Sequence, residues 1–137
     1  MPIGSKGISM VDARDLAAVA ALKLIEREQA EQPLPRETIE LAGPTAMTGE
    51  SAAAIWSEVL GRSVAYAGDD LPAFETTLKQ AGPGWTAYDM RMMCAAFQQY
   101  RMQASATTLN TLVGLLGRPL RTYREFAEET AKAWCNT

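Results

Sequence analysis

The chain has 137 residues and a formal net charge of −3, with 47% hydrophobic and 21% charged residues. This length suits a single domain over residues 1–137 that can bury a core of its own. The 13 Lys and Arg residues form no basic run, which argues against a nucleic-acid partner. The longest apolar run, residues 16–22, is too short to cross a membrane, and no leader sequence opens the chain, so we expect a cytoplasmic protein.

Residue types that usually carry acid–base and metal chemistry are scarce in this sequence. It contains no histidine, which removes the commonest general base near neutral pH and the commonest metal ligand. The two cysteines, Cys94 and Cys135, are too far apart in sequence for a zinc or redox motif. We therefore expect no metal site, and these residues leave open whether the chain is an enzyme.

The front of the chain predicts a strand that runs directly into a helix. Residues 8–11 are typical of a short strand, and Asp12 is a typical N-cap for a helix over residues 13–29. Asp15 adds a second carboxylate in the first turn, where the helix dipole favours negative charge. Because this helix is apolar nearly all the way round, we expect it to need cover on more than one side.

The next segment predicts a second strand and a second helix. Residues 37–41 alternate polar and apolar side chains and end at a Gly-Pro turn, which is typical of a strand. Thr48 is then a good N-cap for a helix that Gly61 ends. A third short strand is predicted at residues 64–66.

The remainder is predicted to be helical. Capping residues and Gly or Pro breaks bound four further helices. These helices are expected at residues 71–81, 85–103 and 109–116 and from residue 123 onward, with Asp69 or Asp70 capping the first and Thr122 with Glu125 capping the last. The expected fold class is helix-rich α+β, with five to six helices and a few short strands.

The helix at residues 85–103 supplies the candidate substrate pocket. Its methionines and aromatic residues would line an adaptable pocket, although methionines at helical spacing more often fill a core. The pocket candidates are Trp85, Tyr88, Met92, Met93 and Phe97. The weak catalytic candidates are Asp69, Asp70 and Asp89, each of which has a simpler role as a helix cap or a solvated loop charge.

Motifs that bind dinucleotides are absent from the sequence. No glycine-rich phosphate loop follows a predicted strand. None of the four tyrosines is followed by a lysine four positions later, as in the Tyr-xxx-Lys pair of short-chain dehydrogenases. We therefore expect no cofactor site in this chain alone.

Four blocks of sequence carry a family resemblance. Residues 8–17 read ISMVDARDLA, residues 39–48 IELAGPTAMT, residues 55–66 IWSEVLGRSVAY and residues 115–126 LLGRPLRTYREF. In this order they resemble the segments F-V-D-V-R-D-I-A, Y-x-L-T-G-P-E-A-L-T, I-L-S-E-V-L-G-R-P-V-x-Y and L-L-G-R-P-P-R-T-F-E-E-F of NmrA-like proteins. That family is a branch of the atypical short-chain dehydrogenases and reductases.

The resemblance implies the C-terminal, substrate-binding half of such a protein, without the nucleotide-binding half that carries the glycine-rich loop. It implies that NAD(P) would bind only if a partner supplied that half. The surfaces that the absent half would cover are expected to pair with another chain, either as a homodimer or with a separately encoded partner.

Three functions stay open at this point. The favoured one is a domain that binds an apolar small molecule or a partner, derived from an NmrA-like NAD(P)-dependent reductase but without redox chemistry of its own. The alternative is a cofactor-free pocket enzyme of the isomerase or cyclase type. The third is an NmrA-like regulatory module or one half of a split NAD(P)-dependent oxidoreductase.

Overall fold

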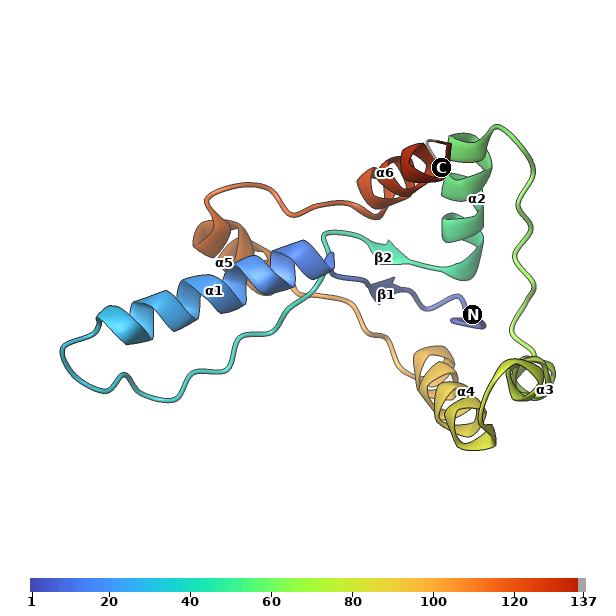
Figure 1. The fold of residues 1–137 in the computed structure, drawn as a ribbon, viewed down its shortest axis with the longest axis horizontal. Helices are drawn as coiled ribbons and strands as arrows, with labels where there is room; N and C mark the ends of the chain where they lie inside the picture. Colours follow the sequence, from blue (N-terminus) through green and yellow to red (C-terminus); the bar gives the residue numbers. More distant parts are fainter. Residues whose placement is uncertain (136–137) are drawn as a thin grey trace.

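Residues 1–135, the part that this computed structural model describes, form six α-helices and two short strands (Figure 1). The strands β1 (Ile8–Ser9) and β2 (Ala46–Met47) pair antiparallel, with Ile8 opposite Met47. The helices are α1 (Ala13–Gln29), α2 (Gly49–Leu60), α3 (Leu71–Ala81), α4 (Gly84–Gln99), α5 (Ala106–Leu116) and α6 (Tyr123–Cys135). The helix-rich class expected from the sequence is confirmed.

The helices form three pairs around the β1–β2 ribbon. Helix α1 packs against α5, α2 against α6, and α3 against α4. In Figure 1 these pairs extend outward as three arms from the ribbon at the centre. The chain exposes 9138 Å² of surface, whereas a compact monomer of its mass would expose about 7,000 Å². The exposed surface includes large apolar side chains such as Leu24, Trp85 and Trp134.

Signals within the sequence correctly predict most of the helix ends. The Asp12 carboxylate accepts a hydrogen bond from the backbone N–H of Arg14 at 2.8 Å. Thr48 and Ser51 bond reciprocally at the start of α2, and Gly61 ends that helix in the left-handed conformation with φ of 62°. The same kinds of cap are made by Asp70 on α3 and by Thr122 with Glu125 on α6. Ser105 caps α5, which therefore begins at Ala106, three residues before the predicted start at residue 109.

Two predicted strands are wrong. Residues 37–41 and 64–66 form irregular connections in the described chain. Ile39 and Leu41 nevertheless pack against the core cluster that Val19 of α1 forms with residues of α5 and the loop after it. The alternation in residues 37–41 thus correctly predicted one apolar face, but a strand also needs a neighbouring strand, and none lies beside this segment in residues 1–135.

The end of β1 and the end of α4 also differ from those predicted. The strand β1 ends at Ser9, two residues before the predicted end, and pairs with β2, a strand that was not predicted from the sequence. Helix α4 stops at Gln99, four residues early, because the chain beyond it turns to lie along β1, where the backbone N–H of Ser9 donates to the carbonyl of Met102 at 2.9 Å.

Helix α1 carries a broad uncovered apolar surface. Only Asp15 and Val19 are buried within it. Leu24 and Ile25 are 68% and 53% exposed, and Leu16 is exposed near the other end. Helix α5 therefore covers one side of α1. The other side faces solvent in this chain, although the apolar sequence of α1 predicts cover on more than one side.

Candidate functional site: a groove between α1 and α6

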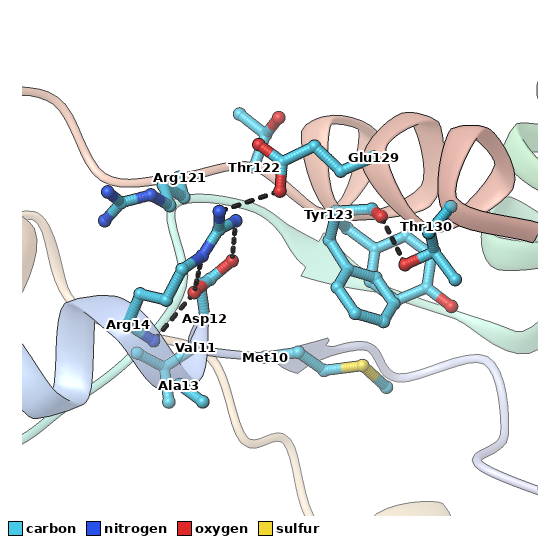
Figure 2. Close-up of a pocket in the computed structure, with 12 residues that line it drawn as sticks. Met10, Val11, Asp12, Ala13, Arg14, Arg121, Thr122, Tyr123, Glu129 and Thr130 are labelled. Atoms are coloured by element: carbon cyan, nitrogen blue, oxygen red, sulfur yellow. Dashed lines mark hydrogen bonds and ion pairs between the residues drawn. The ribbon is translucent and has the colours of Figure 1, made fainter. Parts of the chain in front are cut away.

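A groove of about 620 Å³ lies between the start of α1 and helix α6 (Figure 2). This volume falls within the range of small-molecule sites. The lining residues are Met10, Val11, Asp12, Ala13, Arg14, Arg121, Thr122, Tyr123, Phe126, Glu129, Thr130 and Ala133. The groove was not predicted from the sequence, because its two sides are more than a hundred residues apart in the chain.

An ion pair spans the mouth of the groove. Arg14 donates to Asp12 from Nε at 3.0 Å and from Nη2 at 2.8 Å, and its Nη1 lies 2.7 Å from the Glu129 carboxylate on α6. Hydrogen bonding by Arg14 lowers the pKa of Asp12 to about 2. Arg14 thus links the start of α1 to α6.

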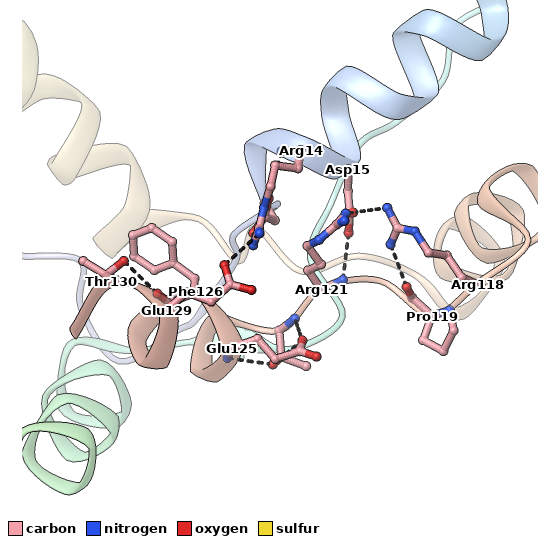
Figure 3. A network of polar contacts seen from close by, with 11 residues as sticks. Arg14, Asp15, Arg118, Pro119, Arg121, Glu125, Phe126, Glu129 and Thr130 are labelled. Carbon is pink, nitrogen blue, oxygen red and sulfur yellow. Dashed lines mark hydrogen bonds and ion pairs between the residues drawn. The ribbon is translucent and has the colours of Figure 1, made fainter. Parts of the chain in front are cut away.

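Behind the groove, a buried carboxylate holds the chain that leads into α6 (Figure 3). Asp15 is 2% exposed and accepts hydrogen bonds from Nη2 of Arg118 at 2.7 Å, from the backbone N–H of Arg121 at 2.7 Å, and from Nη1 of Arg121. Burial alone would raise the pKa of Asp15, but the hydrogen bonds from the two arginines outweigh it and lower that pKa. The network fixes α6 relative to α1.

Asp15 therefore has a larger role than the sequence indicated. It does lie in the first turn of α1, as predicted. Its main partners, however, are Arg118 and Arg121, which are 103 and 106 residues away. No spacing in a single sequence reveals such a pair, so only the three-dimensional structure identifies it.

An aromatic cluster forms the other support of the groove. The rings of Trp56 on α2 and Trp134 on α6 stack with centroids 5.4 Å apart, and Phe126 meets Trp56 edge-on at 6.4 Å. The Trp56 indole N–H donates to the Tyr123 hydroxyl at 3.1 Å. Phe126 remains 45% exposed and presents part of its ring to the groove.

The predicted pocket residues lie elsewhere, on α4. Trp85, Tyr88 and Met92 recur at helical spacing and are 71%, 51% and 46% exposed, so they form an apolar stripe on the surface. Met93 is also exposed and Phe97 is half-buried. The interpretation of Met92 and Met93 as core filling is wrong. These residues do not line the groove.

Two of the three candidate aspartates have structural roles. Asp69 accepts hydrogen bonds from the backbone N–H of Gly4 at 2.8 Å and from the Tyr66 hydroxyl, which holds the first residues of the chain against the start of α3. Asp70 accepts from the backbone N–H of Ala73 at 2.9 Å and caps α3. Asp89 is exposed on α4. None of the three lies at the groove.

Within residues 1–135, no three His, Cys, Asp or Glu side chains are grouped as metal ligands. No helix in the same part of the chain is both long and apolar enough to cross a membrane.

The fold is that of the C-terminal half of a reductase. A solved NADPH-dependent quinone oxidoreductase from Escherichia coli matches 97% of this chain with a TM-score of 0.72, while 46% of that structure is covered. The two are 24% identical in sequence.

Two named reductases are similar to this chain in sequence. An NAD(P)H azoreductase from Xenophilus azovorans is 34% identical over 139 residues, which covers 98% of this chain and 44% of the relative. A (4-alkanoyl-5-oxo-2,5-dihydrofuran-3-yl)methyl phosphate reductase from Streptomyces griseus is 29% identical over 131 residues, covering 96% and 44%. The chain thus spans less than half the length of these reductases. No family model matches it.

Proposed function

We propose that this chain is the substrate-binding half of an NmrA-like NAD(P)H-dependent reductase, and that reduction requires a nucleotide-binding half packed against it. One observation carries the proposal. Nearly the whole chain matches less than half of two enzymes named as reductases, and one of these is named for NAD(P)H. The nicotinamide bound by the second half would supply the hydride, and this chain would bind and orient the substrate.

The uncovered side of α1 is the surface on which we place the second half. Leu16, Leu24 and Ile25 leave it apolar, and the alanines of α1 permit close approach of another helix or a sheet. Residues 37–41 pack beside Val19 of α1, and within residues 1–135 no strand lies next to them, although their alternating pattern indicates one. A parallel sheet in the second half would supply that neighbour. A second copy of this chain is the competing occupant of the same face.

We place the substrate of the assembled reductase against the stripe on α4. Trp85 and Tyr88 offer flat apolar faces there, and Met92 adds an adaptable neighbour. The names of two similar proteins, an azoreductase and a quinone oxidoreductase, favour flat conjugated acceptors. Met93 and Phe97 would complete the site.

A reconstitution experiment tests this proposal. The portion of the Xenophilus azoreductase that this chain does not match is expressed separately and mixed with the chain. Light scattering should show a one-to-one complex, and NADPH oxidation should require both halves and an azo or quinone acceptor. Ile25→Asp should abolish complex formation, whereas Trp85→Ala should leave the complex intact and reduce turnover. NADPH oxidation by this chain alone would contradict the proposal, as would a homodimer that excludes the second half.

A further inference from the structure

The groove between α1 and α6 presents flat apolar walls to solvent. Met10, before α1, and Tyr123, on α6, face each other across it in Figure 2. The ring of Phe126 is held edge-on to Trp56, so its orientation is set before any ligand arrives. Aromatic walls of this kind favour a planar apolar molecule, because stacked and edge-to-face contacts add to the burial of apolar area.

The charges at the groove are balanced and already paired. Two arginines, Arg14 and Arg121, line it together with two carboxylates, Asp12 and Glu129. Arg14 is paired with both of these carboxylates, and Arg121 is paired with Asp15 behind the wall. A charged ligand would have to compete with one of these ion pairs, whereas a neutral ligand would leave them intact.

Arg14 also supplies hydrogen-bond donors at the mouth. A guanidinium has five N–H groups, and the described contacts to Asp12 and Glu129 use one from each of its three nitrogens. The second N–H groups of Nη1 and Nη2 therefore remain for an acceptor atom. Because Arg14 is held by carboxylates from two elements, little side-chain freedom is lost when it binds such an atom.

We propose that this groove binds a neutral, planar, mainly apolar molecule with an accepting carbonyl oxygen directed at Arg14. The volume of about 620 Å³ accommodates a fused aromatic system of two or three rings. The site is formed by this chain alone and lies apart from the α4 stripe. It is therefore a binding site separate from the α4 stripe.

The test uses the full chain and 9-fluorenone, a neutral planar ketone, with fluorene as the matched compound that lacks the oxygen. Trp56 and Trp134 report on the groove when the third tryptophan is removed by Trp85→Phe. Fluorenone should quench this emission saturably. Fluorene should bind about tenfold more weakly, since it leaves the Arg14 donors unused. The carbonyl stretch of bound fluorenone should shift to lower frequency, and Arg14→Met should remove that shift.

Two variants and one control locate the ligand. Phe126→Ala should weaken binding about tenfold through lost ring contact. Ala133→Phe should fill the groove and block binding, with a circular-dichroism spectrum that confirms folding. Thr76→Ser, on an exposed position of α3, should change nothing. Equal affinity in wild type, Phe126→Ala and Ala133→Phe would overturn the proposal, as would the absence of quenching up to the solubility limit of fluorenone.

Discussion

Replacing Asp15 by Asn tests the buried network that positions α6. The substitution keeps the shape of the side chain and one oxygen for the backbone N–H of Arg121, which the carboxylate binds at 2.7 Å. It removes the negative charge that faces the guanidinium groups of Arg118 and Arg121. Two arginines are then left beside a neutral amide in a site where the replaced group was 2% exposed.

The expected cost follows from these contacts. A hydrogen bond to a charged group is worth about 1.5–3 kcal/mol, and two such bonds lose their charge. The Arg118 and Arg121 side chains are 35% and 32% exposed, so water can solvate part of each guanidinium in the variant. The lower end of the range therefore applies. We expect Asp15→Asn to lower the free energy of unfolding by about 2–4 kcal/mol. A loss of this size is a large fraction of the stability of a typical domain.

Urea unfolding followed by circular dichroism measures the loss, and Asp70→Asn is the matched control. Asp70 caps α3 through the N–H of Ala73, and Asn caps equally well, so that variant should stay within about 0.5 kcal/mol of wild type. The pKa of Asp15 is lowered in the folded state. The charged carboxylate therefore stabilises the fold fully above the pKa of an unfolded aspartate, and this stabilisation is lost as pH falls below that value. The gap between wild type and Asp15→Asn should therefore shrink below about pH 4. A cost equal to that of Asp70→Asn, or a gap that does not change on acidification, would refute the reasoning.

Three further outcomes are expected. In urea titrations Gly49→Ala should lower the free energy of unfolding by about 1–3 kcal/mol, because the added Cβ would lie 2.1 Å from the Tyr66 ring. Gly114→Ala should raise it by about 0.5–1 kcal/mol, because the Cβ would enter open space and alanine favours the helix. An absorbance titration should show a tyrosine that ionises near pH 12, because burial and the bond to Asp69 raise the pKa of Tyr66 to about 12. The free energy of unfolding should fall as pH rises above about 10, and Tyr66→Phe should remove the ionisation near pH 12 and lessen that fall. Trp134→Ala should cost about 1 kcal/mol and weaken the near-ultraviolet dichroism by ending the stack on Trp56; an unchanged spectrum would contradict that packing.

Features set by neighbouring residues could be predicted from the sequence. The caps at Asp12, Thr48 and Asp70 depend on a side chain reaching a backbone N–H two or three residues later. The helix end at Gly61 depends on the left-handed conformation that glycine adopts at little cost. These local determinants stay the same whatever the rest of the chain does.

Features that depend on distant partners could not be predicted. Residues 37–41 have the alternation of a strand, but pairing requires a neighbour that the described chain does not contain. The groove requires the bond between Arg14 and Glu129, which are far apart in sequence, and the buried position of Asp15 requires Arg118. The sequence indicated which apolar residues of α4 could bind a ligand, but it did not indicate that they are exposed. Helical periodicity does not show whether another element covers a face of the helix.

The open arrangement of three arms has a thermodynamic consequence. The unfolded chain would expose about 21,600 Å², so folding to 9138 Å² buries about 58% of that surface, a fraction typical of a domain of about 60 residues. The heat capacity change of unfolding and the urea slope both scale with the surface exposed on unfolding. By itself the chain should therefore melt over a broad temperature range with a shallow urea dependence, and the docking of a second half on α1 should steepen both transitions.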